Sequence, residues 1–350
     1  MKIEQDTAQI FSGVRHGLTM GGPITLVIRN RDWENWSPIM DPVKPIPDEL
    51  NLKLQRLAHE TTTPRPGHAD LSGGIKWNHH DLRNVLERAS ARETAARVGI
   101  GSLARQLLEH FHVEFASHIV RIGEVALSKA PNLTDLSRVQ KITEESEVRC
   151  LDAATEKKMI ADIREAKKKR DSVGGIVELI VRGLPVGLGG FSQWSNRLDG
   201  QLAAALMSIH SVKGVEIGRG FEGATLRGSA YHDQIYFSPN GDKAKKRFFR
   251  KSNNAGGLEA GITNGEDLIL RVASKPISTL NQPLDSVDVK SKKPAKAMVE
   301  RTDNCVVPAL AVICEAAAAL VLADAFLAKF GADNFVETQR NYQSWLDVDY

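Results

Sequence analysis

The chain has 350 residues, enough for one large domain or two fused halves with a sizeable core. Charged residues make up 25% of it and apolar residues 42%, which excludes disordered and fibrous classes. The 46 basic residues barely exceed the 43 acidic ones, so the whole molecule is not expected to attract nucleic acid or a membrane surface. Any anion must therefore bind at a local site.

Cysteine usage and the N-terminal residues indicate the compartment. Cys150, Cys305 and Cys314 form neither a disulfide framework nor a paired zinc motif, which indicates a reducing environment. Residues 1–11 have neither the apolar stretch of a secretory signal nor an Arg-rich leader. We therefore expect a cytoplasmic protein.

One apolar segment, residues 306–330, approaches the length of a membrane span. Glu315 and Asp324 interrupt it, and carboxylates at those depths would be costly in lipid. Its alanines suit close packing against other helices. We therefore expect a buried helix of a soluble protein and no membrane partner.

Hydrophobic periodicity predicts an alternation of strands and helices along the chain. Their order suggests two sheet-plus-helix halves with internal pseudo-symmetry, and hence a layered α+β architecture. The predicted elements are a strand at 24–30, a helix at 81–111, a strand at 113–125, a helix at 156–171, a strand at 174–184, a helix at 198–209, strands at 212–218 and 267–274, and a helix at 306–330.

Two basic runs, residues 243–251 and 290–296, interrupt the ordered segments. The first carries two Phe among six cations, so a nucleic-acid patch with stacking aromatics is one interpretation. The small net charge favours the other interpretation, in which both runs are solvated loop edges near a site for a small anionic molecule. We expect no nucleic-acid partner.

Several common catalytic signatures are absent. The chain has no phosphate-binding GxxxxGK[ST] loop, no HExxH and no paired CxxC, and its Gly-rich segment 183–191 fits no dinucleotide fingerprint. His110, His112 and His118 lack Cys or acidic partners at ligand spacing, so no metal site is predicted.

Three short segments combine Arg with Ser, His or Asp. They are RPGHAD at 65–70, ERASARET at 87–94 and RTDNC at 301–305. Arg side chains pair bidentately with phosphate and carboxylate, which makes a ligand bearing both groups the natural partner. For any one of these segments alone, a salt-bridged surface or a capped turn is the favoured interpretation.

Taken together, six segments of this chain resemble the signature blocks of the chorismate synthase family, in the correct order. They are RPGHAD, SARETAARV at 90–98, MSIHSVKGVEIGRGFE at 207–222, NNAGGLEAGITNGEDL at 253–268, KPISTL at 275–280 and RTDNC. The resemblance covers essentially the whole chain.

The resemblance implies a lyase that converts 5-enolpyruvylshikimate 3-phosphate to chorismate and phosphate by 1,4-elimination. This is a step of the shikimate pathway of aromatic amino-acid biosynthesis. The family uses reduced FMN without net oxidation, with NADPH as a candidate reductant. The resemblance also implies a homotetramer and, over residues 1–350, a single domain with a β-α-β sandwich fold.

The same resemblance assigns roles to individual residues. His68 matches the histidine that protonates the reduced flavin, and Asp303 the acidic residue near its reactive nitrogen. Arg92 is expected to bind the substrate phosphate or carboxylate. The remaining matched positions are flavin contacts: Arg88, Ala89, Ser90, His210, Ser211, Ala260, Lys275, Pro276, Ile277, Ser278, Thr279 and Arg301.

One departure from the family pattern concerns the N-terminus. Family members begin with a strand and a GESHG motif, and this chain is expected to lack that segment. Such a chain is either an incomplete copy of the enzyme with low activity or a catalytically silent remnant that binds flavin or associates with other subunits.

Overall fold

The structure, a computed structural model, describes residues 6–47, 54, 58–128 and 133–350. The chain divides into two compact units. Unit 1 comprises Met1–Ala96 and Ser278–Thr302, and unit 2 comprises Arg97–Ile277 and Asp303–Tyr350. The expectation of a single domain over residues 1–350 stays a prediction.

A five-stranded sheet forms the centre of unit 2, with the order β6-β5-β7-β13-β8 and antiparallel neighbours throughout. Buried side chains alternate along β13, whereas the middle of β5 and β7 is buried on both faces. The four strands predicted between residues 113 and 274 all belong to this one sheet. The bounds are β5 Glu114–Ile122, β6 Val125–Ala126, β7 Gly175–Arg182, β8 Val212–Ile217 and β13 Leu268–Ser274.

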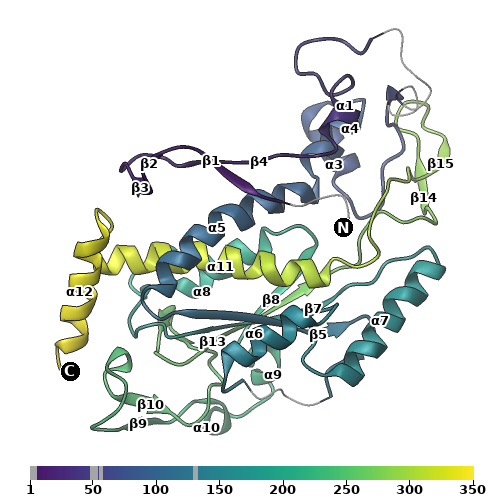
Figure 1. Cartoon of the computed structure of the whole chain (residues 1–350). Coiled ribbons are helices and arrows are strands. Elements are labelled where there is room, and N and C mark those ends of the chain that lie inside the picture. Colours follow the sequence, from purple (N-terminus) through teal and green to yellow (C-terminus); the bar gives the residue numbers. More distant parts are fainter. Residues whose placement is uncertain (1–5, 48–53, 55–57, 129–132) are drawn as a thin grey trace. The chain divides into compact units, whose positions relative to one another are not determined.

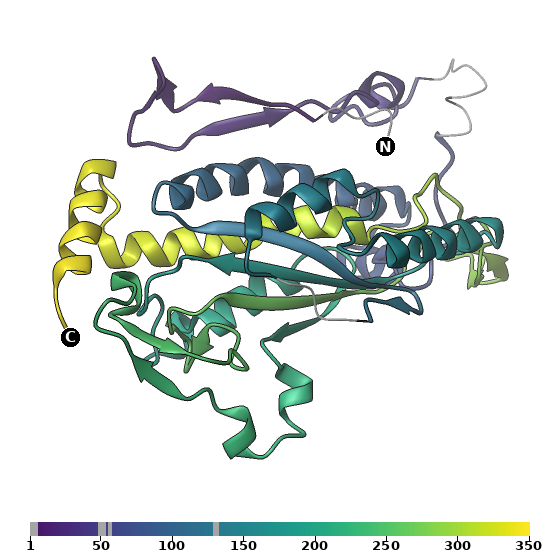
Figure 2. The same cartoon turned by 60° about the horizontal axis from the view of Figure 1, so that its bottom comes forward.

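Helices cover both faces of this sheet. α11 (Val307–Phe330) and α8 (Leu198–Met207) pack on one face, and α6 (Leu136–Glu145) packs on the other (Figures 1 and 2). By length and composition, α11 is the one described helix that is apolar enough to cross a membrane, yet 72% of its most apolar 18-residue stretch is buried inside the protein. The expected buried helix is thereby confirmed.

α5 (Thr94–Glu109) crosses α11 at Gly101 (Figure 1). A Cβ atom at Gly101 would lie 2.5 Å from Cβ of Ala316 and 2.6 Å from its carbonyl oxygen. Only hydrogen therefore fits at this crossing, and the two helix backbones approach closely.

Replacing Gly101 with alanine is expected to lower the free energy of unfolding by about 1–3 kcal/mol, because the added methyl overpacks the crossing. Gly200 in α8 is the matched control, since a Cβ there would meet nothing within 4 Å. Gly200→Ala should raise stability by up to about 1 kcal/mol through its better helix propensity. Denaturant titration of both variants measures the two effects, and a Gly101 variant as stable as the Gly200 variant would contradict the close approach.

The prediction of a single helix over residues 81–111 is wrong. It divides into α4 (Arg83–Arg88), the 3-10 helix η1 (Ala91–Glu93) and α5. Ser90 causes the break: its backbone is extended, and its hydroxyl accepts a hydrogen bond from the Arg92 N–H at 3.3 Å. A serine that bonds the backbone in this way starts a helix rather than continuing one.

Unit 1 consists of short elements. Its N-terminal strands β1 (Ala8–Ser12) and β4 (Thr25–Ile28) pair antiparallel, which confirms the strand predicted at 24–30. The segment before RPGHAD is held by the second stretch of unit 1, because carbonyls of Thr62 and Thr63 accept the N–H groups of Val289 and Met298. The other elements are β2 Val14–Arg15, β3 Leu18–Thr19, α1 Trp33–Trp36, α3 Asp70–Trp77, β14 Asp285–Val287 and β15 Pro294–Lys296.

The remaining elements belong to unit 2. The helix predicted at 156–171 is α7 (Ala153–Lys168), which begins earlier because the Asp152 side chain caps it through the Thr155 N–H. The others are η2 Trp194–Asn196, α9 Gly220–Gly223, α10 Gly228–Tyr231, β9 Ile235–Phe237, η3 Lys243–Lys245, β10 Phe248–Arg250, β11 Leu258–Glu259, β12 Ile262–Thr263 and α12 Phe335–Asp347.

The basic run at 243–251 is engaged within the protein itself. Each of its six cations contacts an acid or an aromatic ring of unit 2, which agrees with the interpretation as a loop edge. The contacts are Lys243–Asp347, Lys245–Glu266, Arg247–Asp349 and Arg250–Glu259 as ion pairs, and Lys246–Trp345 and Lys251–Tyr236 as cation–π pairs.

Candidate functional site

In unit 1, the RPGHAD turn forms a compact cluster of charged groups around Asp70. The Asp70 side chain is fully buried. Its Oδ1 lies 2.6 Å from Nδ1 of His68 and accepts a hydrogen bond from Arg65 Nη2 at 3.0 Å. Its Oδ2 accepts from the Arg65 backbone N–H at 3.0 Å and from Nε at 2.8 Å.

These contacts keep Asp70 ionised. Burial by itself would raise the pKa of this carboxyl, but hydrogen bonds from His68 and Arg65 outweigh the burial and hold the pKa well below its usual range. The site therefore contains a permanent anion at neutral pH, compensated by one permanent cation. The imidazole of His68 lies between the buried pair and solvent, with 19% of its side chain exposed.

Arg65 also joins this turn to a second predicted motif, KPIST. Its Nη1 donates to the Thr279 hydroxyl at 2.7 Å, and Thr279 is 6% exposed. A Cβ atom on Gly67 would lie 3.5 Å from Cβ of Ser278, an ordinary van der Waals distance, so these two residues are neighbours. Within unit 1 the structure thus brings His68 together with Ser278 and Thr279, which lie more than 200 residues away in sequence.

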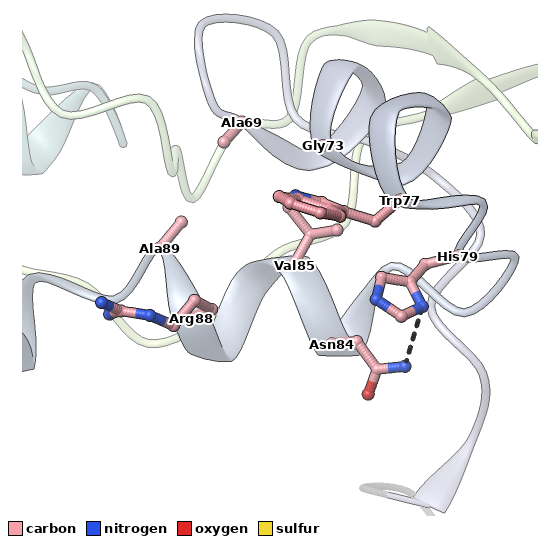
Figure 3. A pocket seen from close by; sticks show the side chains of 8 residues that line it. All are labelled: Ala69, Gly73, Trp77, His79, Asn84, Val85, Arg88 and Ala89. Carbon is pink, nitrogen blue, oxygen red and sulfur yellow. Dashed lines mark hydrogen bonds between the residues drawn. The ribbon is translucent and has the colours of Figure 1, made fainter.

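A cavity of about 430 Å³ opens between α3 and α4 of unit 1 (Figure 3). Arg88 and Ala89, both predicted flavin contacts, line it. Trp77, His79 and Asn84 line it as well, and sequence reasoning missed all three. Figure 3 shows the indole of Trp77 over Val85, with His79 hydrogen-bonded to Asn84 and Arg88 extending away from them. The complete lining is Ala69, Gly73, Trp77, His79, Asn84, Val85, Arg88 and Ala89.

A glycine shapes this cavity. A Cβ atom at Gly73 would lie 2.5 Å from Cγ1 of Val85, so α3 approaches α4 at a distance that only glycine allows. The dense aromatic and polar run KWNHHD at 76–81, which begins in the last turn of α3, is a signal that would have identified Trp77 and His79, and Asn84 follows it by three positions.

Arg92 and Ser90 are already occupied within unit 1. Arg92 donates to both carboxylate oxygens of Asp6, at 2.6 and 2.8 Å. This pair lowers the pKa of Asp6, mainly through the hydrogen bond from Arg92. An anionic ligand at Arg92 has to replace Asp6, and the assignment of Arg92 to the substrate stays a prediction.

In unit 2, two other predicted segments meet at the end of the sheet. The Ser211 carbonyl accepts the Lys275 N–H at 2.9 Å, and the Ser211 hydroxyl lies 2.9 Å from that of Ser274. Ser211 follows His210 with φ at +69°, a left-handed conformation that is uncommon for serine. The structure therefore places the His210–Ser211 pair directly beside the KPIST loop.

Lys275 lies near a second lysine, Lys213. Burial lowers the pKa of Lys275 below the ordinary value, and the neighbouring Lys213 lowers it further. Neither ammonium group forms an ion pair with a residue in the described part of the chain. Two neighbouring cations without an acidic partner favour binding of an anion such as phosphate.

The other predicted residues are placed as follows. Ala260 is exposed between β11 and β12, with φ at +51°. The Ile277 carbonyl accepts the hydroxyl of Ser172 at 2.6 Å, which anchors Pro276 and the loop. Arg301 in unit 1 and Asp303 in unit 2 both have exposed side chains. The roles assigned to these residues stay predictions.

Comparison with known proteins identifies close relatives. The sequence model of the family described as "Chorismate synthase" matches residues 1–327. A protein of that name from Alkaliphilus metalliredigens (strain QYMF) is 48% identical over 349 residues, covering 99% of this chain and 87% of the relative. The one from Symbiobacterium thermophilum is 49% identical over 347 residues, with 99% and 86% coverage.

A solved structure supports the fold as well as the sequence relationship. The "Crystal Structure of Chorismate Synthase" superposes with a TM-score of 0.76 at 39% identity, covering 98% of this chain and 84% of that one. The expected α+β class is confirmed. The expectation that the chain lacks the N-terminal GESHG segment is not borne out by these comparisons.

Proposed function

Because the chain belongs to the chorismate synthase family, and is therefore a carbon–oxygen lyase of aromatic amino-acid biosynthesis, we propose that it eliminates phosphate from 5-enolpyruvylshikimate 3-phosphate to give chorismate. The alternative, a catalytically silent remnant, is not favoured by relatives that match nearly the whole chain.

The elimination breaks a C–H bond and a C–O bond, releasing a proton and phosphate and leaving a new double bond in the ring. The protein has to hold an anionic substrate, place a proton acceptor near the C–H bond and stabilise the departing phosphate. Reduced FMN, when bound, supplies an electron-rich ring and is not consumed in the overall reaction. We assign the proton at the flavin to His68 and the acidic group near its reactive nitrogen to Asp303.

The observation that carries this proposal is the geometry around His68. A histidine whose ring is hydrogen-bonded to a buried carboxylate, and which remains partly exposed, is suited to hold and deliver a proton. The arginine that completes this cluster also binds Thr279 of the KPIST loop, so two predicted cofactor segments meet at one place in unit 1.

Several residues would hold the flavin. In unit 2, Lys275 with Lys213 suits the flavin phosphate, because two cations without an acidic partner gain most from a bound dianion. In unit 1, Arg88 and Ala89 offer a guanidinium and a small side chain at the rim of a cavity that also contains an indole. The other assigned flavin contacts keep their roles within the proposal.

The phosphate assignment is tested by comparing two flavins. Reduced FMN should bind more tightly than oxidised FMN, and Lys275→Met should weaken FMN binding by about ten- to a hundredfold through loss of a charge-assisted contact. Riboflavin, which lacks the phosphate, should bind both proteins equally. Anaerobic fluorescence titration measures all of these affinities.

The matched control for this titration is Lys169→Met. Lys169 forms an exposed ion pair with Glu165 on the surface of unit 2, so this change removes one positive charge away from the assigned site. It should leave both affinities unchanged. Equal weakening of FMN and riboflavin by Lys275→Met would contradict the assignment of the phosphate to Lys275.

Further parts of the proposal rest on the family resemblance alone. They are a homotetrameric assembly, a cytoplasmic location and NADPH as the source of electrons for the flavin. Sedimentation equilibrium tests the assembly, and reduction of FMN by NADPH in the presence of the protein tests the electron source.

A further inference from the structure

The carboxylate of Asp70 has no spare hydrogen-bonding capacity. Its Oδ2 accepts two bonds from Arg65, and its Oδ1 accepts one more from Arg65 and contacts Nδ1 of His68 at 2.6 Å. Because the carboxyl is held in its ionised form, it can only accept hydrogen bonds. The short contact with His68 therefore requires a hydrogen on Nδ1 of the imidazole.

The second ring nitrogen of His68 is left available. Arg65 Nη2 lies 2.9 Å from Nδ1 and 3.2 Å from Nε2. A group at similar distances from both nitrogens lies over the face of the ring and not along the lone-pair direction of either nitrogen. No other hydrogen bond to this ring is formed within the described part of the chain. The lone pair of Nε2 thus remains for a ligand.

We propose that Asp70 and Arg65 are positioning residues that fix the tautomer and orientation of His68. They hold the neutral ring with hydrogen on Nδ1, so that Nε2 is the atom that takes up and gives back a proton. Through Thr279, Arg65 ties this orientation to the KPIST loop. The consequence of this arrangement for catalysis rests on the role assigned to His68 in the proposed function; the tautomer itself does not.

The substitution Asp70→Asn makes this arrangement testable. Two Arg65 donors face the Oδ2 position and only one faces Oδ1, so the amide oxygen of asparagine is expected at the Oδ2 position and its NH₂ at the Oδ1 position, facing His68. An NH₂ there donates to Nδ1 and forces the hydrogen onto Nε2. The variant therefore carries the opposite tautomer with almost no change in volume.

The first readout is the tautomer of His68 in the flavin-free full chain, by ¹⁵N–¹H long-range correlation at alkaline pH, with the signals assigned by their loss in His68→Gln. Wild type should show hydrogen on Nδ1, and Asp70→Asn should show it on Nε2. Asp81→Asn is the matched control, since Asp81 accepts backbone N–H bonds from Thr61 and Arg83 in the same unit. It should leave the His68 signals unchanged.

Hydrogen on Nε2 in the wild-type chain would overturn the proposal. The wild-type spectrum decides the question even if Asp70→Asn does not fold.

The second readout is turnover. Asp70→Asn should lower kcat by about 10²-fold, with little change in KM. In a chain that already carries His68→Gln, Asp70→Asn should cause no further loss of kcat. If His68→Gln lowers kcat but Asp70→Asn keeps the wild-type kcat, the positioning role is overturned. If His68→Gln also turns over normally, the role of His68 in the proposed function fails while the tautomer result still stands.

Discussion

Replacement of His68 with alanine is expected to lower the turnover of 5-enolpyruvylshikimate 3-phosphate by about 10²–10⁴-fold, the usual contribution of a positioned acid–base group. The ring is held against the buried Asp70 carboxylate and remains partly exposed, so its loss removes a proton donor and acceptor without opening the core. Single-turnover and steady-state rates with reduced FMN measure this loss.

His80 provides the control for this experiment. It is an exposed histidine in the same unit, and its replacement with alanine should leave the rate unchanged. The thermal midpoint of the His68 variant should stay close to that of the wild type. A His68→Ala variant as fast as His80→Ala would show that the RPGHAD histidine has no part in the chemistry.

Replacement of Glu315 with alanine is expected to lower the free energy of unfolding by about 3–5 kcal/mol, because it removes a buried carboxylate that two arginines and a buried hydroxyl share. Glu315 is 6% exposed within α11. Its carboxylate accepts a hydrogen bond from Arg105 at 2.6 Å and another from the Ser117 hydroxyl, and Arg149 lies 3.7 Å away. This cluster explains why a carboxylate occurs within such an apolar helix.

Glu109 provides a control on the same arginine. It pairs with Arg105 at 2.9 Å, but half of its side chain is exposed, so Glu109→Ala should cost no more than about 1 kcal/mol. Denaturant titration of both variants separates a buried ion pair from an exposed one. Equal losses of stability in the two variants would contradict the structural role of Glu315.

The individual strands of the central sheet were predicted well, whereas their assembly into one sheet and the helix boundaries were predicted less well. Strands such as β7 are recognisable because a short apolar run bounded by glycines is too short for a typical helix and is typical of a buried strand. The break between α4 and α5 was missed, since the apolar spacing continues through it. One hydroxyl, that of Ser90, decides the break by bonding to the backbone.

The candidate site was predictable only where it is local in sequence. The RPGHAD segment brings Arg65, His68 and Asp70 within six residues, and this density suggested a functional turn. The bond from Arg65 to Thr279 spans 214 positions, and no spacing rule predicts it. The pairing of Arg92 with Asp6 is equally invisible in the sequence, because it depends on how the N-terminal strands run.

The most direct test of the proposed function is an anaerobic assay of the whole chain with reduced FMN and 5-enolpyruvylshikimate 3-phosphate, following chorismate and inorganic phosphate together. We expect both products in equal amounts, over many turnovers, only while the flavin is reduced and without its net oxidation. If the chain binds reduced flavin and substrate yet releases neither product, it is not an active chorismate synthase, and the proposed function is wrong.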